Sequence, residues 1–191
     1  MKVDNPIVSF NDEKLIIVDE NDNVLEYKNK ESTHEGDGIL HRAFSLFIFN
    51  DKKELLIQQR SQQKPLWPLF WANSVCSHPR KGEDYDTAIH RRLKEELGIT
   101  TPLTFLFRFQ YQARFGHEGS ENELCSVYIG KSNDKIVANG NEIAKWKFIN
   151  LKQLEIEITE NPDKFTPWFK IELKKIRSRF MHEIENLYVK I

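Results

Sequence analysis

Two short segments of the chain combine potential metal ligands with groups that can move a proton. In the first, Cys76 stands two positions before His78, and in the second, Glu121 and Glu123 stand two positions apart. A thiol becomes a useful base once its pKa is lowered and thiolate is present near neutral pH. A carboxyl group beside a metal or a second carboxylate can be tuned into a useful acid. Together they allow an enzyme to add a proton at one carbon and remove a proton at another.

Two further histidines, His34 and His41, extend this set toward a metal site, because they flank a loop that leads into a strongly apolar stretch. With His78, Glu121 and Glu123 they offer three imidazoles and two carboxylates, which suit a divalent ion such as Zn²⁺ or Mn²⁺. Residues two apart on a strand point to one face, so both glutamates can reach the same ion. The ligands come from three distant segments, however, so the spacing is also consistent with surface histidines and a solvated acidic strand end.

The composition favours one globular domain covering residues 1–191. A chain of 191 residues with 39 % hydrophobic content can bury one full core. The formal net charge of −1 gives no basic surplus, so nucleic acid is not implied as a partner. No apolar run approaches the ~20 residues that a membrane helix needs, and the first residues lack the apolar stretch of a signal peptide. We therefore expect a cytoplasmic protein in which Cys76 and Cys125 are free thiols.

The elements that must position these residues indicate an α+β fold, in which a mixed sheet lies between helices. Apolar runs bounded by turn residues predict strands at residues 15–18, 24–27, 42–49, 54–60, 103–114, 123–130 and 143–149. The strands at residues 42–49 and 54–60 are expected to form a hairpin. Helical patterns cover residues 84–97, 151–155 and most of 162–188. Residues 28–38 are expected to be loop, and residues 61–76 an ordered loop that enters a short strand.

The predicted helix at residues 84–97 carries an unusual density of charge. Four of its apolar side chains fall on one face: Ala88, Ile89, Leu93 and Leu97. Arg92 and Glu96 lie four positions apart and share another face, as do Arg91 and Glu95. Taken alone, this pattern is typical of a solvated helix with ion pairs along its surface.

The spacing of the charges nevertheless resembles the Nudix box, because Glu83 is followed after seven residues by Arg91 and then by Glu95 and Glu96. In the Nudix family, a loop, a helix and a second loop hold carboxylates on a divalent cation, which binds a diphosphate. Oxygen ligands suit Mg²⁺, whose coordination is usually completed by substrate phosphates and water. The resemblance implies the Nudix fold, with mixed β-sheets between α-helices.

Two positions depart from the usual Nudix pattern. Ser77 stands where a glycine usually opens the box, and Arg92 replaces the first acid of the conserved core. That acid normally helps to assemble the hydrolytic metal site. Its replacement by a cation weakens the interpretation as a hydrolase and suits a protein that binds a diphosphate without cutting it.

The whole set of motifs resembles type 1 isopentenyl-diphosphate isomerase. The matching elements run in order from about residue 30 to 170: His34 with His41-Arg42-Ala43-Phe44, Trp67-Pro68, residues 71–79, the modified Nudix helix, Glu121-Asn122-Glu123, and Thr166-Pro167-Trp168. Cys76 with His78-Pro79, together with Glu121-Asn122-Glu123, separates this family from ordinary Nudix hydrolases. The resemblance implies an enzyme that moves a double bond between isopentenyl and dimethylallyl diphosphate.

The resemblance also implies a role for each matching residue. Glu123 is the expected acid, Cys76 the expected base, Tyr111 a hydrogen-bonding partner of the acid, and Trp168 an aromatic face against the carbocation. Three groups of further residues are implied: Lys30, Arg60, Lys64 and Arg92 for the diphosphate, His34, His41, His78, Glu121 and Glu123 for a first ion (Mn²⁺, Zn²⁺ or Mg²⁺), and Glu96 for a second ion, Mg²⁺, that accompanies the diphosphate. His78 at the metal and the nearby cations are expected to depress the pKa of Cys76.

Two other classes of protein remain as alternatives. A Nudix hydrolase that cleaves a small diphosphate would use Glu83, Glu95 and Glu96, but Arg92 and the pair of Cys76 and Glu123 argue against it. A binding or regulatory protein on the same scaffold would have lost a catalytic residue, and none is missing from the isomerase set. We expect a monomer or weak homodimer that acts on a small prenyl diphosphate, with neither nucleic acid nor membrane as a partner.

Overall fold

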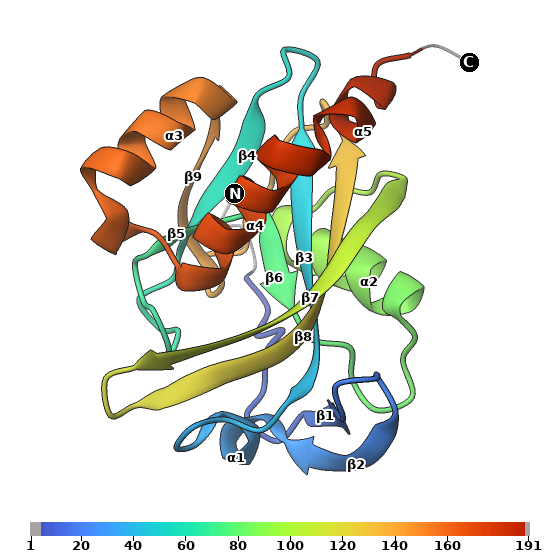
Figure 1. Ribbon diagram of the computed structural model, residues 1–191, viewed down its shortest axis with the longest axis vertical. Helices are drawn as coiled ribbons and strands as arrows, with labels where there is room; N and C mark the ends of the chain where they lie inside the picture. The colour runs from blue at the N-terminus through green and yellow to red at the C-terminus, as the bar shows by residue number, and fades with distance from the viewer. Residues whose placement is uncertain (1–4, 190–191) are drawn as a thin grey trace.

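A mixed β-sheet forms the centre of the molecule in the computed structural model, which describes residues 5–189 (Figure 1). The sheet contains nine strands: β1 Lys14–Val18, β2 Val24–Asn29, β3 His41–Phe49, β4 Leu55–Arg60, β5 Trp71–Ala72, β6 Val75–Ser77, β7 Leu103–Phe115, β8 Gly119–Lys131 and β9 Ile143–Ile149. β3 runs through its middle, where it pairs in parallel with β8 and antiparallel with β6. β7 pairs with β8, and β9 pairs with β4.

Helices cover both faces of this sheet, as Figure 1 shows. They are α1 Lys30–His34, α2 Tyr85–Leu97, α3 Leu151–Glu160, the 3₁₀ turn η1 Pro162–Lys164, α4 Pro167–Arg179 and α5 Met181–Asn186. Side chains alternate along β3, so Phe47 packs with Phe169 of α4, while Leu46 lies in the core that contains Leu93 of α2. The predicted α+β fold with helices on both sides of a mixed sheet is therefore confirmed.

Four features differ from the prediction. Residues 28–38 are not all loop, because β2 continues to Asn29 and α1 follows it directly. The predicted hairpin of β3 and β4 pairs only at Phe49 and Leu55, because most of β3 pairs with β6 and β8 instead. β8 begins at Gly119, which places Glu121 and Glu123 inside a long strand. Helix α3, predicted at residues 151–155, continues to Glu160.

The predicted charged helix is confirmed as α2. The side chain of Asp84 accepts a hydrogen bond from the Thr87 backbone N–H at 2.8 Å and caps its start. Gly98 ends it with a φ of 71°, a conformation that residues with a Cβ rarely adopt. The interpretation of its charged face as solvated is wrong, because Arg92 and Glu96 are each only 2 % exposed.

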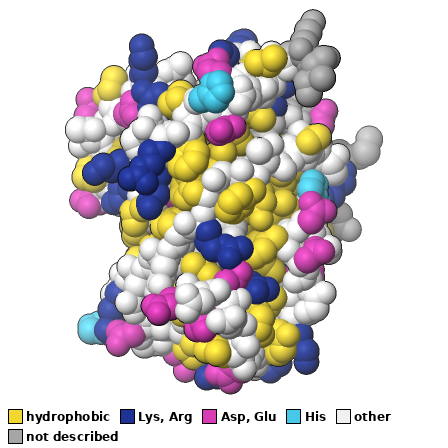
Figure 2. Space-filling view, turned by 45° about the vertical axis from the view of Figure 1, so that its right-hand side comes forward, with side chains coloured by type: hydrophobic (Ala, Val, Ile, Leu, Met, Phe, Trp, Pro, Cys, Tyr) yellow, Lys and Arg dark blue, Asp and Glu magenta, His cyan; other side chains and the backbone are white. Residues whose placement is uncertain are grey.

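The surface of the described part of the molecule carries both signs of charge. In Figure 2, Lys and Arg side chains are interspersed with Asp and Glu side chains around a band of hydrophobic ones. This distribution agrees with a net charge of −1. Among the described helices, none has the length and apolar character required to cross a membrane.

Candidate active site

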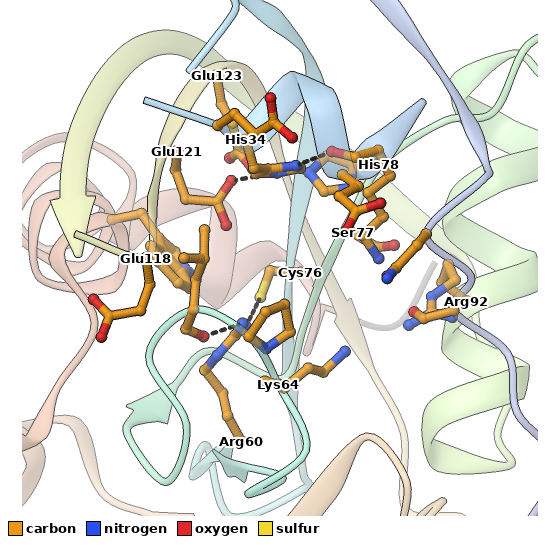
Figure 3. A pocket seen from close by; sticks show the side chains of 18 of the residues that line it. His34, Arg60, Lys64, Cys76, Ser77, His78, Arg92, Glu118, Glu121 and Glu123 are labelled. Atoms are coloured by element: carbon orange, nitrogen blue, oxygen red, sulfur yellow. Dashed lines mark hydrogen bonds and ion pairs between the residues drawn. The ribbon is translucent and has the colours of Figure 1, made fainter. Parts of the chain in front are cut away.

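A cavity of about 350 Å³ opens between α1, the segment that follows β4, and the long strands β7 and β8 (Figure 3). Most of the side chains predicted from the sequence line it: Lys30, His34, Arg60, Lys64, Cys76, His78, Arg92, Tyr111, Glu121, Glu123 and Trp168. His41 lies behind His34 and His78, with its ring centre within 4.9 Å of each of theirs. Glu96 is buried behind Arg92. The structure thus gathers residues from segments far apart in the chain around one space.

Five of these side chains form what we call the histidine cluster: His34, His41, His78, Glu121 and Glu123. α1 ends at His34, β3 begins at His41, and His78 directly follows β6. Parallel pairing of β3 with β8 sets His41 opposite Glu123. One ligand atom from each histidine and from Glu121 all lie within 4.8 Å of one another. His78 Nε2 lies 3.0 Å from Glu123 Oε1, so the second carboxylate also reaches the cluster.

Backbone carbonyls orient two of the imidazole rings. His34 Nδ1 lies 2.7 Å from the Lys30 carbonyl oxygen, and His41 Nδ1 lies 2.7 Å from that of Ile39. A ring whose Nδ1–H donates to a carbonyl presents its Nε2 lone pair to the opposite side, as metal-ligating histidines do. His41 Nε2 is buried without a hydrogen-bond partner among residues 5–189. A divalent ion at the centre of the cluster would satisfy that atom.

The two glutamates of the cluster differ in their tendency to ionise. Burial and the neighbouring Glu121 carboxylate raise the pKa of Glu123 well above its usual range, although Tyr111 donates a 2.7 Å hydrogen bond to its Oε2. Burial opposes ionisation of Glu121 as well, but His34, 2.9 Å away, lowers the pKa of Glu121 well below its usual range. Two close carboxyl groups rarely ionise together. Glu123 is therefore the one of the pair that holds a proton to donate.

Cys76 lies at the middle of β6, between the histidine cluster and Arg60 (Figure 3). Arg60 Nη1 is 3.6 Å from its sulfur. The nearby cations do not by themselves depress the pKa of this thiol below its usual value. Burial raises the pKa of Cys76 to about 12, and the charge of Arg60 offsets burial only in part.

The Arg60 guanidinium is fixed in its place by the backbone of the following loop. Its Nε donates to the Trp67 carbonyl oxygen at 3.1 Å, and its Nη2 donates to that of Leu66 at 2.8 Å. Trp67 has a φ of +47°, which is uncommon for a residue with a large side chain. The guanidinium carbon also lies 5.3 Å from the ring centre of Trp168. These contacts direct the free end of Arg60 toward Cys76.

At the opposite side of the cavity lies a second group, the ion-pair cluster: Lys64, Arg92, Glu96 and Glu142. Arg92 donates to Glu96 Oε1 through Nε at 3.1 Å and through Nη2 at 2.5 Å. Glu142 accepts a hydrogen bond from Lys64 and lies 3.2 Å from Arg92 Nη2. Burial lowers the pKa of Lys30, next to this cluster, to about 8, and repulsion from Lys64 adds to the shift. The cations predicted for a diphosphate are thus close enough to repel one another.

Some residues of the site were not predicted from the sequence. Ser9 and Asn11 line the cavity, and the Val8 carbonyl accepts a 2.9 Å hydrogen bond from Arg92, although residues 1–12 show no functional pattern. Glu142 is a single acid in a polar loop, and no motif or spacing singles it out. Only the tertiary structure brings these residues to the site.

Comparisons with known proteins show which family the chain belongs to. The sequence model of the NUDIX domain family matches residues 39–169. The chain is 44 % identical to Isopentenyl-diphosphate Delta-isomerase 1 of Photorhabdus laumondii, over 84 % of this chain and 92 % of the relative. It is 39 % identical to Isopentenyl-diphosphate Delta-isomerase of Serratia proteamaculans, over 89 % and 94 %. The crystal structure of DR0079 from Deinococcus radiodurans is similar in fold, with a TM-score of 0.64, 23 % identity, and coverage of 78 % of this chain and 90 % of that one.

Proposed function

The chain belongs to the isopentenyl-diphosphate Delta-isomerases of the NUDIX family and interconverts isopentenyl and dimethylallyl diphosphate, and from this premise we propose how its residues share the reaction. The observation that carries the proposal is the placement of a protonated carboxyl and a thiol on one cavity. Glu123 and Cys76 both line it, on strands that flank β3 on opposite sides. An acid and a base so placed can act on the two neighbours of one carbon.

Glu123 donates its proton to the terminal alkene carbon of isopentenyl diphosphate, and the double-bond electrons form the new C–H bond. The tertiary carbocation that results loses a proton from the neighbouring carbon to the Cys76 thiolate, and the electrons of that C–H bond form the new double bond. Because the reaction is reversible, acid and base exchange roles in the other direction. Cys76 must first lose its own proton, and Arg60 Nη1 at 3.6 Å is the donor placed to stabilise the thiolate.

Two aromatic residues assist these steps. Tyr111 holds Glu123 through the 2.7 Å hydrogen bond and so fixes the direction in which the carboxyl points. Trp168, only 2 % exposed, lines the cavity on the side of α4. Its ring face can stabilise a desolvated carbocation by ~2 kcal/mol. We assign Tyr111 to orientation of the acid and Trp168 to stabilisation of the cation.

We propose that the histidine cluster holds a divalent ion, with Mn²⁺, Zn²⁺ and Mg²⁺ as the candidates. Three imidazoles and two carboxylates are a suitable donor set, and the unpartnered Nε2 of His41 fits a metal ligand. A bound ion would favour the ionised forms of the carboxylates and so make Glu123 a stronger acid.

The diphosphate would bind at Lys30, Lys64 and Arg92, which all line the cavity. Arg60, predicted for the same role, instead donates two hydrogen bonds to backbone carbonyls and directs a third N–H group at Cys76. Glu96, predicted as the ligand of Mg²⁺, does not line the cavity, and both its oxygens already accept hydrogen bonds, from Arg92 and from Gln58. This arrangement does not fit Glu96 as a direct ligand, so we assign it no step, and Mg²⁺ accompanying the diphosphate remains a prediction.

Several predictions about the whole protein also stay proposals. They are a single domain over residues 1–191, a cytoplasmic location, a monomeric or weakly dimeric state, and the absence of nucleic-acid and membrane partners. Size-exclusion chromatography with light scattering tests the oligomeric state directly.

The decisive experiment follows isopentenyl diphosphate in D₂O by proton and phosphorus NMR with the purified, metal-supplemented protein. We expect dimethylallyl diphosphate with deuterium in its new methyl group and an intact diphosphate. Release of phosphate without movement of the double bond would instead indicate hydrolysis and contradict the roles of Cys76 and Glu123.

A further inference from the structure

Glu142 is a buried carboxylate that the reaction described above does not use. It immediately precedes β9 and is only 3 % exposed. Its backbone is fixed at both ends, because its N–H donates to the Asn139 carbonyl at 3.0 Å and its carbonyl accepts from the Ser61 N–H at 2.8 Å. The side chain is therefore held where it is by the loop between β8 and β9.

Glu142 is ionised in spite of its burial. Burial opposes its charge, but Lys64 and then Arg92 outweigh that effect and lower the pKa of Glu142 to about 2. Its Oε2 accepts from Lys64 Nζ and lies 3.2 Å from Arg92 Nη2. One carboxylate oxygen thus serves both of the cations that would bind the diphosphate.

The geometry places Glu142 behind these cations. Lys64 and Arg92 line the cavity, whereas Glu142 does not. An anion that enters the cavity meets the two cations on one side while Glu142 neutralises them from the other. Glu142 also offsets the repulsion that lowers the pKa of Lys30. The Glu142 carboxylate forms ion pairs with both cations, and its negative charge repels any other anion that approaches them.

We infer that Glu142 is a built-in counter-anion that limits the affinity of the pocket for a diphosphate, an inference that rests on the proposed roles of Lys64 and Arg92. The diphosphate is unchanged by isomerisation, so substrate, transition state and product all carry it. Binding it more tightly lowers KM without lowering the barrier from the bound state, and it slows product release. Glu142 keeps the binding of the diphosphate group, which is equal in substrate and product, weak enough for the product to leave.

The test compares the wild type with Glu142→Gln, whose carboxamide keeps a hydrogen-bond acceptor for Lys64 but removes the charge. Inorganic pyrophosphate is titrated by calorimetry in magnesium-free buffer. We expect ~10-fold tighter binding, the scale for removing one charge near a partly buried anion site. KM for isopentenyl diphosphate and kcat are expected to fall together, which a merely structural role would not produce. Glu157→Gln, which removes the acid from the ion pair between Lys147 of β9 and Glu157 of α3, serves as the matched control and should bind pyrophosphate as the wild type does.

Unchanged or weaker pyrophosphate binding by the folded Glu142→Gln variant, or a raised KM, would overturn the inference. Glu142→Asn provides a second neutral side chain if the glutamine variant does not fold. A different result would count against the proposed diphosphate site and not against the isomerisation: a wild type that isomerises its substrate but shows no competition by pyrophosphate would mean that Lys64 and Arg92 do not bind the diphosphate.

Discussion

The two sides of the pocket treat buried charge in opposite ways. In the ion-pair cluster, both carboxylates contact cations directly, Glu96 with Arg92 and Glu142 with Lys64 and Arg92. In the histidine cluster, His41 Nε2 has no hydrogen-bond partner in the described part of the chain, and the pKa of Glu123 is raised by burial and Glu121. The charges of the first side are paired within the protein, whereas the second offers an unpartnered imidazole nitrogen that a divalent ion would satisfy. Buried polar groups therefore indicate function more clearly when they lack hydrogen-bond or ion-pair partners within the protein.

The largest effect on turnover should come from Glu123→Gln in the histidine cluster. A carboxamide cannot donate the carboxyl proton, so we expect isomerisation to fall ~10²–10⁴-fold, the usual contribution of an acid or base. Bound metal should fall as well, because a neutral oxygen is a weaker ligand, while pyrophosphate binding at the ion-pair cluster should not change. NMR turnover, elemental analysis and calorimetry measure the three quantities. An active variant with a full complement of metal would rule out Glu123 as the acid.

Cys76→Ser separates catalysis from metal binding on the same side of the pocket. We expect a comparable ~10²–10⁴-fold loss of turnover with unchanged metal content, since Cys76 is not a member of the histidine cluster. The same NMR assay and elemental analysis apply. Turnover near the wild-type rate would show that the thiol is not the base.

Arg92→Met, in the ion-pair cluster, should have the largest effect on the free energy of unfolding. It leaves the buried carboxylates of Glu96 and Glu142 without their shared cation, and breaking such a network typically costs ~3–5 kcal/mol. Arg91→Met is the matched control, because Arg91 pairs with Glu83 and Glu95 but is 18 % exposed and should cost at most about 1 kcal/mol. Urea unfolding of both variants gives the difference. Equal losses would mean that the ion-pair cluster contributes no more than a surface pair.

The order of strands and helices could be predicted from the sequence because apolar periodicity is local. Strand β9 has the predicted residues and helix α2 differs from its predicted range by one residue, since each is set by its own pattern and by turn or cap residues. The pairing of β3 with β8 could not be predicted in the same way, because it joins segments some 80 positions apart. The hairpin expected from the proximity of β3 and β4 in the chain is accordingly almost unpaired.

The chemistry of the site was partly predictable for a similar reason. Resemblance to a known family supplied the residues that now line the cavity, but it could not supply their surroundings. The burial of Arg92 depends on Val8 and Glu142, which approach from remote parts of the chain. The pKa of Cys76 is raised rather than lowered because the surrounding core desolvates the thiol more than Arg60 stabilises its charge.

Removal of metal tests the comparison between the two sides directly. An ion that binds only the folded protein stabilises it by about 2.7 kcal/mol at one hundred times its dissociation constant. We expect a chelator to lower the free energy of unfolding of the metal-loaded wild type by roughly that amount, and Mn²⁺ or Zn²⁺ to restore it. His41→Gln should not respond to either treatment. A wild type that loses its metal without any change in stability would show that the histidine cluster does not depend on an ion.

The last prediction concerns Glu172, a buried carboxyl group on α4. The side chain is fully buried, its Oε1 lies 3.6 Å from Cys125 Sγ, and its Oε2 has no partner among residues 5–189. Burial raises the pKa of Glu172 from 4.5 to about 8, so the folded protein keeps a proton that the unfolded chain loses. Between pH 4.5 and about 8, this group makes stability fall as pH rises, by at most about 1.4 kcal/mol per pH unit. Glu172→Gln should remove that part of the slope, whereas Glu160→Gln on the exposed face of α3 should keep it. Denaturant unfolding at several pH values measures both slopes, and identical slopes for the two variants would mean that Glu172 ionises near its ordinary pKa.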